Sequence, residues 1–417
     1  MEAANAEAIK RMNSAELLLK DVRPAREVIP AFNDKNRKLV LVSGPPVDWK
    51  RMCNAQKGAV QGVVVFEGWA KTPQEAYELC EKGHIQFEPN HHHNAVGPMA
   101  GTISPSFPVF VVENTTFKHT VFCRPADLAQ QFGDYNNIKD IIWWREGVAP
   151  YLSEGLRKRG PVSLIPPMAK ALEMGDEAHN RNDALTTLLS NEFALGMLQA
   201  GVPNDKIIPV LEWFNYKNFA TGSGTRAFLG IVMSAAKAIL DPIIGIEYST
   251  IVSCMSRNGT DFGMKVSGLG NEWFTAPAPI PEGHFFGNYS QKDVGRDMGD
   301  SAITEAAGFG AFILAGAPGF IKGLPADYKK IWQVTNENME ITTGRNKLFP
   351  IAVFDFAGAP IGIDIRRVVK NNFEPWIDTG ITHKDSGHRV IGRGFSRAPM
   401  EAFKKAYDAF EKKYGKL

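Results

Sequence analysis

Short apolar runs alternate with one well-marked helix signal between residues 38 and 113, and this alternation constrains the fold most. Thr72, Pro73 and Glu75 stand at the N-cap, the first helical position and the capping-box position, so they predict a helix over residues 72–82. The apolar runs around it predict strands at residues 38–43, 62–66 and 109–113. This order favours a small parallel sheet in an α/β layer.

The rest of the chain changes pattern twice. Apolar residues at helical spacing predict helices at residues 167–174, 182–200, 206–213 and 225–240. Strand-like pieces follow at residues 249–254, 261–266 and 351–354, and an amphipathic helix over 400–414 closes the chain. We therefore expect a multi-domain α/β protein with an N-terminal α/β domain (1–135), a mainly helical domain (136–245) and a C-terminal mixed α/β domain (246–417).

Two segments bear on targeting. Residues 1–20 predict an amphipathic helix that lacks the apolar core of a secretory signal and the composition of a transit peptide. The apolar stretch 306–321 contains four glycines and Pro318 and is short for a bilayer span, so it predicts a buried, tightly packed helix. We expect a cytoplasmic protein that does not bind a membrane.

The charge balance and the cysteines exclude several classes of protein. The chain of 417 residues has 47 basic and 45 acidic side chains, which is too even to indicate a nucleic-acid partner. Its 44% hydrophobic and 22% charged residues are typical of globular proteins. Cys53, Cys80, Cys123 and Cys254 are widely spaced, which argues against a disulfide framework and a thiolate zinc site.

The first segment that carries chemistry is residues 91–106, HHHNAVGPMAGTISPS. Side chains of adjacent residues on a strand face opposite ways, so at most His91 and His93 could share a metal. The glycine-rich loop that follows can offer N–H groups and hydroxyls to an anionic oxygen. The substrate-binding candidates are His93, Asn94, Gly97, Gly101 and Ser104. The alternative is a tight turn with solvated histidines.

The second segment is residues 174–182, MGDEAHNRN. Asp176 and His179 are three residues apart and Glu177 and Arg181 four apart, so each pair would share one face of a helix. A carboxylate beside an imidazole orients it and raises its basicity, as general acid/base catalysis requires. Asp176, Glu177 and His179 are catalytic candidates, with Asn180 and Arg181 as substrate-binding ones; the alternative is a helix start with ordinary ion pairs.

The third segment is residues 256–263, SRNGTDFG. Arg257 carries a planar, permanent cation that matches a carboxylate or phosphate and is a catalytic candidate. Asn258, Thr260 and Asp261 are substrate-binding candidates. Asn258 and Gly259 are also a common hairpin turn, which is a strong structural alternative.

The fourth segment is residues 298–305. The fifth combines residues 358–364 with 378–384, and simple turns are an alternative explanation of both pieces. Asp300 and Glu305 are catalytic candidates, and Ser301 and Thr304 between them can bind substrate, although capping alone is an alternative explanation of Asp300. His383 and Lys384 are candidates for a second cationic contact. The sequence contains no phosphate-binding P-loop, GxGxxG dinucleotide motif or GxSxG elbow, and we expect no cofactor and assign no metal.

Several of these strings together resemble the YlbE/AllG-like family. The resemblance covers roughly residues 90–400 and is carried by AVGPMAG (95–101), MGDE (174–177), RNGTDFG (257–263), GDSAITE (299–305) and GIDI (362–365). The family is linked to allantoin catabolism, a part of purine degradation. The resemblance implies a subunit of oxamate carbamoyltransferase, which transfers a carbamoyl group between oxalurate and phosphate, giving oxamate and carbamoyl phosphate. It also implies two partner proteins, one of them FdrA-like, and an oligomer.

Carbamoyl transfer agrees with these residue types, since its tetrahedral oxyanion needs cations or N–H donors and no covalent nucleophile. Under this hypothesis, Arg257 and the loop 97–104 hold phosphate or carboxylate, His179 polarises or protonates, and Asp300 and Glu305 position the amide nitrogen. Two alternatives stay open. One is an amidohydrolase of a small amide or ureide, metal-assisted through His91, His93 or His179; the other is a non-catalytic subunit of a carbamoyltransferase complex.

Overall fold

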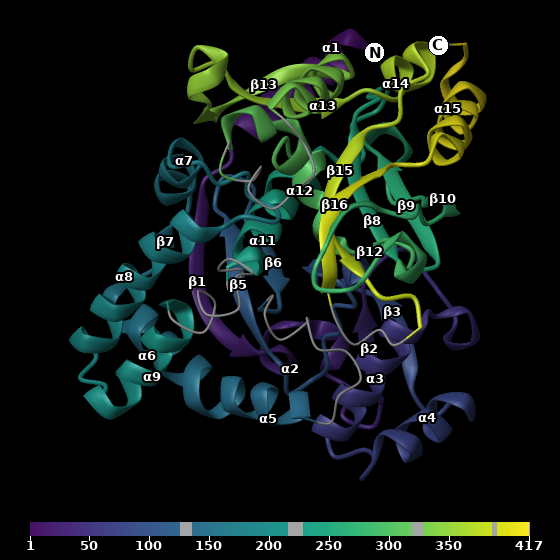
Figure 1. Cartoon of the computed structure of the whole chain (residues 1–417). Helices are drawn as coiled ribbons and strands as arrows, with labels where there is room; N and C mark the ends of the chain where they lie inside the picture. The colour runs from purple at the N-terminus through teal and green to yellow at the C-terminus, as the bar shows by residue number, and fades with distance from the viewer. Residues whose placement is uncertain (126–135, 216–227, 318, 320–327, 386–389, 417) are drawn as a thin grey trace.

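The computed structural model describes residues 1–125, 136–215, 228–317, 319, 328–385 and 390–416 (Figure 1). Helices and several separate sheets alternate along the chain, which confirms the mixed α/β class. The domain boundaries near residues 135 and 245 stay a prediction.

The largest sheet has the strand order β4-β6-β5-β1-β7. Its pairs are antiparallel except β4 with β6, which run parallel. The strands are β1 (Leu17–Pro24), β4 (Ala95–Val96), β5 (Pro108–Asn114), β6 (His119–Cys123) and β7 (Val162–Ser163). A separate pair of β2 (Leu39–Val42) and β3 (Gln86–Pro89) is parallel. The expected parallel arrangement therefore holds for this small pair, whereas β5, the predicted strand at 109–113, lies in the mainly antiparallel sheet.

The described residues of the second half form three antiparallel sheets, ordered β10-β9-β8-β12, β11-β16-β15 and β13-β14. Their strands are β8 (Val252–Asn258), β9 (Asp261–Val266), β10 (Phe274–Pro277), β11 (Glu282–Phe285), β12 (Met298–Gly299), β13 (Thr342–Pro350), β14 (Gly358–Ile363), β15 (Trp376–Thr382) and β16 (Val390–Arg397). β15 and β16 run beside the β8–β9–β10 sheet, with α15 at the upper end (Figure 1).

The helices surround these sheets. α6, α8 and α9 lie together on the side of β1, α3 and α4 lie near β2 and β3, and α11 lies in the middle of the molecule (Figure 1). The helices of the first half are α1 (Glu2–Asn13), α2 (Ala25–Val28), α3 (Asn54–Phe66), α4 (Pro73–Glu81), α5 (Asn136–Trp143), α6 (Ala149–Arg159), α7 (Ile165–Glu173), α8 (Asp183–Gln199), α9 (Asn204–Asn215) and α11 (Leu229–Leu240). Those of the second half are α12 (Ile303–Ala306), α13 (Tyr328–Glu340), α14 (Ile365–Asn371) and α15 (Met400–Tyr414).

Helix α1 is tied to parts of the chain that come much later. The Asn5 side chain accepts a hydrogen bond from the Thr250 backbone N–H and donates one to the Thr250 hydroxyl, both 2.9 Å long. The Asn13 side chain accepts a bond of 2.7 Å from the Lys347 N–H on β13. The first helix therefore completes a part of the fold made by the second half of the chain.

Most predicted helices are confirmed where the structure describes them, namely α4, α7, α8, α9, α11 and α15. Thr72 caps α4 by accepting a bond of 3.1 Å from the Glu75 N–H. Of the predicted strands, residues 38–43, 109–113, 249–254 and 261–266 overlap β2, β5, β8 and β9. The segment 216–227, which includes the predicted start of α11, lies outside the described residues.

Four sequence predictions were wrong or incomplete. Residues 62–66 belong to helix α3 and not to a strand, and residues 352–354 form a 3-10 turn. The expected helix over residues 1–20 ends at Asn13, after which the chain enters β1. The described part of 306–321 contains only the last residue of α12 and short 3-10 turns, because its glycines favour turns over a long helix.

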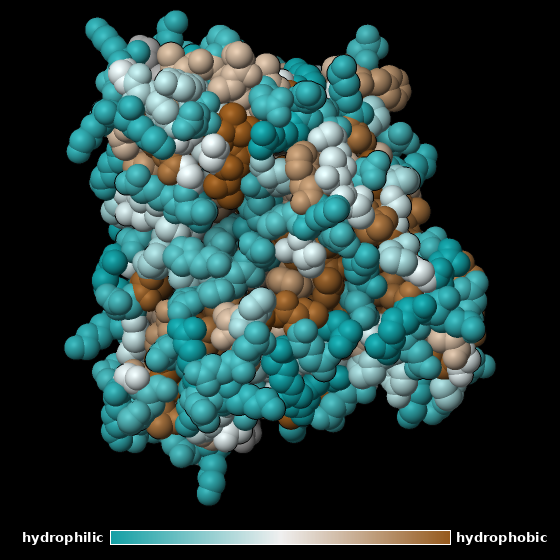
Figure 2. Space-filling view, turned by 180° about the vertical axis from the view of Figure 1, so that it is seen from behind, coloured by the Kyte–Doolittle hydropathy of each residue, from teal (hydrophilic) through white to brown (hydrophobic). Residues whose placement is uncertain are grey.

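Hydrophilic residues cover most of the face in Figure 2, and hydrophobic residues lie there in separate patches. Within the described ranges, no helix is both long and apolar enough to cross a bilayer.

Candidate functional site

The loop between α7 and α8 is held by its own acidic side chains. Asp176 accepts hydrogen bonds of 3.2 Å and 2.9 Å from the N–H groups of Ala184 and Leu185, so it caps the start of α8. Ala178 adopts the left-handed conformation, with φ of 66°. Segment 176–182 is therefore not a helix, and the predicted pairing of Asp176 with His179 on a helix face does not occur.

His179 instead meets two carboxylates from distant elements. Its Nδ1 lies 2.8 Å and 3.0 Å from the two oxygens of Glu305, on α12, and 3.0 Å from Oδ1 of Asp378, on β15. All three side chains are buried. Burial alone would lower the pKa of His179, but the charges of Glu305 and Asp378 outweigh it and raise this pKa to about 10. Among the described residues, these three side chains are a group that could hold a metal ion.

Glu177 holds the backbone of the loop that carries His179. Its carboxylate accepts bonds from the backbone N–H groups of His179, at 3.0 Å, and Arg181, at 2.6 Å. Burial, together with the charge of Asp378, raises the pKa of Glu177 well above its usual value. Glu177 thus fixes the loop and adds a further acid beside His179.

Gly310 is required where the chain leaves α12. Its φ is +58°, and a Cβ there would lie 2.1 Å from Oε1 of Glu305. Its N–H donates a bond of 2.7 Å to the carbonyl of Glu177. The glycine therefore lets residues 305–310 turn back against the 176–182 loop, which brings Glu305 to His179.

Two arginines lie at the edge of the acidic group. Arg181 is partly exposed, and its Nε is buried with no hydrogen-bond partner among the described residues; the nearest carboxylate oxygens belong to Asp176, at 3.6 Å, and Asp183, at 3.8 Å. Burial lowers the pKa of Arg393, on β16, while the charges of Glu177 and Asp378 oppose this effect and that of Arg181 adds to it. Arg393 therefore lies near the same group and was missed in the sequence; Asp378 lies in the fifth segment but was not chosen there as a site residue.

Arg257 is placed differently from the sequence expectation. Its Nε and one terminal nitrogen each bond Asp297 at 3.0 Å, and the remaining N–H groups face the Gly299 carbonyl, Ser301 and Thr379. The side chains of Arg257 and Asp297 are fully buried. Because these contacts account for all five guanidinium N–H groups, Arg257 forms a structural ion pair with Asp297 and has no donor left for a substrate.

Asp300 joins the first, third and fourth sequence segments. It accepts bonds of 2.8 Å from the N–H groups of Gly44 and Gly97 and of 2.6 Å from the Ser256 hydroxyl. The Asn90 amide donates a fourth bond of 2.8 Å. Burial alone would raise the pKa of Asp300, but His91 and the hydrogen bonds from Ser256 and Gly44 lower it. The N–H of Gly97 is thus occupied by Asp300 and not offered to an anion.

A second buried group surrounds His91 and includes Lys237 and Cys254, which sequence reasoning missed. Lys237 Nζ lies 3.4 Å from His91 Nδ1 and 2.9 Å from Asp241, which also pairs with His119 at 2.7 Å. The Cys254 sulfur lies 3.5 Å and 3.6 Å from the two ring nitrogens of His91. Similar distances to both nitrogens place the sulfur over the ring, so it is not aligned for proton transfer.

Asp241 makes the stability of this group dependent on pH. Burial alone would raise its pKa, but Lys237 and His119 lower it from 3.8 to about 2. A lowered folded-state pKa gives stability that is present above about pH 4 and lost as the pH falls toward 2. We expect Asp241→Asn to reduce the loss of unfolding free energy between pH 5 and pH 2 by about 2 kcal/mol. Urea unfolding at several pH values measures this free energy. An equal decrease between pH 5 and pH 2 for the wild type and the variant would contradict the prediction.

The other predicted site residues lie in several places. His93 pairs with Glu88, Asn94 takes a left-handed conformation that ends a turn, and Ser104 donates to Glu67. Asn258, Thr260 and Asp261 form a hairpin turn in which the Asn258 side chain accepts from the other two N–H groups.

Two predicted residues do contact the His179 group. Thr304 donates to Glu305 at 3.1 Å, and Asn180 donates to Asp378 at 3.0 Å. Lys384 is exposed, and the Lys384 N–H donates to the Asp293 carbonyl.

A close approach of two glycines explains the loop 97–101. A Cβ on Gly97 would lie 2.6 Å from the Gly101 carbonyl oxygen, and one on Gly101 would lie 2.3 Å from the Gly97 carbonyl carbon. These glycines therefore let the loop fold on itself under Ser43, whose hydroxyl faces the carbonyls of both. Since the Gly97 N–H already bonds Asp300, a contact between a substrate oxygen and this loop stays a prediction for Gly101.

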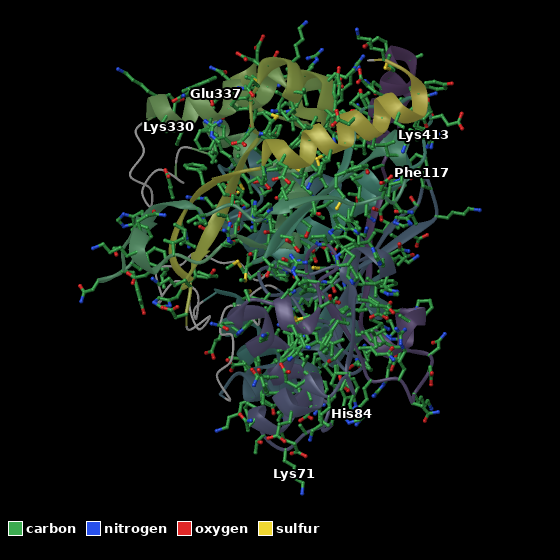
Figure 3. The ribbon with its side chains drawn as sticks, turned by 90° about the vertical axis from the view of Figure 1, so that its right-hand side faces the viewer. Lys71, His84, Phe117, Lys330, Glu337 and Lys413 are labelled. Carbon is green, nitrogen blue, oxygen red and sulfur yellow. The ribbon has the colours of Figure 1, made fainter. Side chains whose placement is uncertain are left out.

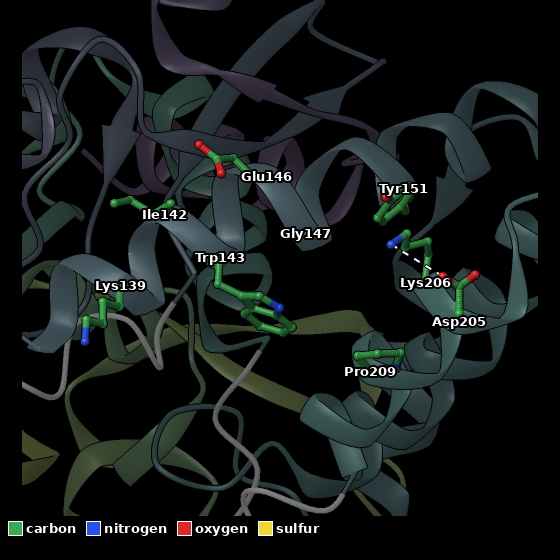
Figure 4. Close-up of a pocket in the computed structure, with 9 residues that line it drawn as sticks. All are labelled: Lys139, Ile142, Trp143, Glu146, Gly147, Tyr151, Asp205, Lys206 and Pro209. Atoms are coloured by element: carbon green, nitrogen blue, oxygen red, sulfur yellow. Dashed lines mark ion pairs between the residues drawn. The ribbon is translucent and has the colours of Figure 1, made fainter.

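Two open cavities lie apart from the His179 group. One, of about 530 Å³, lies between the α5–α6 region and α9, with Trp143 in its wall and an Asp205–Lys206 ion pair of 3.4 Å (Figure 4). The other, of about 780 Å³, is lined by Lys330, Trp376 and Arg397 among others. Lys330 and Glu337 project from α13 at the top of the molecule (Figure 3). Neither cavity is lined by His179, Glu305 or Asp378.

Fold and site together define a mixed α/β protein with a buried imidazole held between two carboxylates from distant segments of the chain. The family model described as oxamate carbamoyltransferase subunit AllG matches residues 85–301. The chain is 38% identical to oxamate carbamoyltransferase subunit AllG of Escherichia coli K12, over 99% of this chain and 98% of that protein. It belongs to this family, which confirms the resemblance seen in the sequence.

Two further relatives extend the comparison. The uncharacterized protein YahG of Escherichia coli K12 is also 38% identical, over 99% of this chain and 86% of YahG. A crystal structure of a conserved protein of unknown function from Enterococcus faecalis V583 is 36% identical and has a TM-score of 0.93, covering 99% of this chain and 98% of that one. The whole fold is therefore shared with a solved structure.

Proposed function

We propose that this protein is a subunit of a carbamoyltransferase that acts on a small acidic ureide of the oxalurate type, with phosphate as the acceptor. The observation that carries the proposal is the 38% identity with subunit AllG over nearly the full length of both chains. A subunit named in this way works with partner proteins, and we propose an FdrA-like protein as one of them.

The reaction needs charge stabilisation and no covalent intermediate. A phosphate oxygen attacks the carbamoyl carbon of oxalurate, forming a C–O bond and a tetrahedral oxyanion. The C–N bond then breaks, and the proton lost by phosphate ends on the nitrogen of oxamate. Positive groups aimed at the oxyanion and at the anionic ends of the substrates lower the barrier.

We assign these roles to groups around His179. A positive centre at His179, held by Glu305 and Asp378, faces the carbamoyl oxygen. Arg181 and Arg393, at the edge of this group, bind the carboxylate of oxalurate and the phosphate. Arg257 and Asp300 have a structural role: Arg257 donates hydrogen bonds to Ser301 and Thr379, and Asp300 accepts one from the Gly97 N–H.

A phosphate-dependence assay tests the function. Oxalurate is incubated with the chain, alone and with an FdrA-like partner, and oxamate and carbamoyl phosphate are measured by mass spectrometry. Cleavage that requires phosphate supports the proposal; turnover only with the partner supports the subunit form of it. Equal cleavage without phosphate would instead favour the amidohydrolase alternative. No cleavage under any of these conditions would overturn the proposal.

The assignment of the two arginines can be tested with two site variants and one control variant. We expect Arg181→Ala and Arg393→Ala each to lower phosphate-dependent cleavage about 10- to 100-fold, since a lost charged hydrogen bond costs about 1.5–3 kcal/mol. Arg159→Ala is the control, because Arg159 forms a surface ion pair with Glu192 on the outer helices. If both site variants keep the rate of the control, the assignment of the arginines is wrong.

A further inference from the structure

We propose that His179, Glu305 and Asp378 bind one divalent metal ion, Zn²⁺ or Mn²⁺, and that this ion is the positive centre of the site. The binding stands on the geometry alone; only its use as the positive centre rests on the proposed function. The ligand set of one imidazole nitrogen and two carboxylates fits these ions better than Ca²⁺, which takes oxygen ligands only.

The distances around His179 fit a coordination shell. Its Nδ1 has three carboxylate oxygens within 3.0 Å, two from Glu305 and one from Asp378. One ring nitrogen carries at most one hydrogen, which cannot point at two different carboxylates with good geometry. Ligand atoms that each lie about 2.1 Å from a shared ion are about 3.0–3.4 Å apart, and the ligand atoms of this group all lie within 4.8 Å of one another.

An unpartnered oxygen is the second, independent observation. Oδ2 of Asp378 is buried with no hydrogen-bond partner among the described residues, and the Asp378 side chain is fully inaccessible. A buried carboxylate oxygen without a donor costs free energy. A cation bound to the Asp378 carboxylate supplies the missing partner.

The surrounding groups orient the three ligands. Asn180 donates to Oδ1 of Asp378 at 3.0 Å, and Thr304 donates to Oε2 of Glu305 at 3.1 Å. The backbone N–H of Asp378 reaches Oε1 of Glu305 at 3.3 Å. Such outer contacts fix the ligand side chains, as in established metal sites.

Metal binding is measured on the full chain without substrate. The protein is dialysed against a chelator and then titrated with Zn²⁺ or Mn²⁺ by calorimetry, with bound metal counted by mass spectrometry. We expect one ion per chain, and at least about tenfold weaker binding for His179→Gln and for Asp378→Asn. The control is His84→Gln, since His84 lies exposed at the far end of the molecule (Figure 3).

The wild-type result decides the inference even if the variants fold poorly. Failure of the chelated wild-type chain to bind either ion overturns it, as does binding that both site variants keep at full affinity. Anomalous diffraction from Mn²⁺-soaked crystals should place the ion on Nδ1 of His179, and an ion found elsewhere would also overturn it. An ion bound at this place in a protein that shows no carbamoyl transfer keeps the metal site and removes only the proposed function. Full-rate transfer by a metal-free protein overturns the metal as the positive centre and leaves the proposed function standing.

Discussion

Replacing Arg257 with alanine is expected to lower the free energy of unfolding by about 3–5 kcal/mol, because it leaves the buried carboxylate of Asp297 without its cation. The two side chains share two hydrogen bonds of 3.0 Å and have no solvent access. The guanidinium also satisfies the Gly299 carbonyl and the Thr379 hydroxyl. Urea unfolding followed by circular dichroism measures the loss.

Two matched variants separate the unpaired charge from general damage. Arg159→Ala, which breaks a surface ion pair, should cost less than about 1 kcal/mol. Arg257→Lys keeps a cation beside Asp297 and leaves the hydrogen bonds of Thr379 and Ser396 to this carboxylate in place, so it should lose less stability than Arg257→Ala. If Arg257→Ala unfolds like the wild type but binds substrate poorly, the structural assignment fails and the substrate role expected from the sequence returns.

Replacing Asp300 with alanine is expected to cost at least about 4 kcal/mol, since four buried donors lose one acceptor at about 1–3 kcal/mol each. The donors are the N–H groups of Gly44 and Gly97, the Asn90 amide and the Ser256 hydroxyl. Because total stabilities are about 5–15 kcal/mol, this variant should unfold at much lower urea concentration or fail to accumulate as folded protein.

Asp293 offers the control for Asp300. Its carboxylate also accepts from a backbone N–H and a hydroxyl, both of Ser290, but it lies in a partly exposed turn. Asp293→Ala should therefore cost only about 1 kcal/mol. Equal losses for the two variants would show that burial around Asp300 does not set the cost.

The sequence predicted those parts of the fold that have local causes. Thr72 and Glu75 mark the start of α4, and helical spacing of apolar residues predicts α8 and α15. Residues 62–66 were misassigned because a glycine followed by four apolar residues fits either a strand or the end of helix α3. Glycines in 306–321 were assigned to close helix packing, whereas the structure uses Gly310 in a left-handed turn.

The candidate site was only partly predictable, because long-range pairing decides it. His179 and Glu305 were selected because many polar residues surround them in the sequence. Nδ1 of His179 and Oε1 of Glu305 lie 2.8 Å apart, although the two residues are 126 positions apart. Asp378 lies in the fifth polar segment, but only His383 and Lys384 were selected there, because a single acid in a strand gives no sign of its distant partners. Arg257 looked like an anion-binding residue because its own partner, Asp297, lies 40 residues away in the sequence.

The contacts of α1 also determine when the chain can finish folding during synthesis. Asn5 can form its hydrogen bond only after Thr250 has been synthesised. Asn13 can do so only after Lys347, which leaves the ribosome more than 300 residues later. At roughly 5–20 residues per second, this delay is on the order of twenty seconds or more. Until β13 and β14 have been made, the apolar side of the first helix, including Ala8 and Met12, therefore lacks part of its final packing.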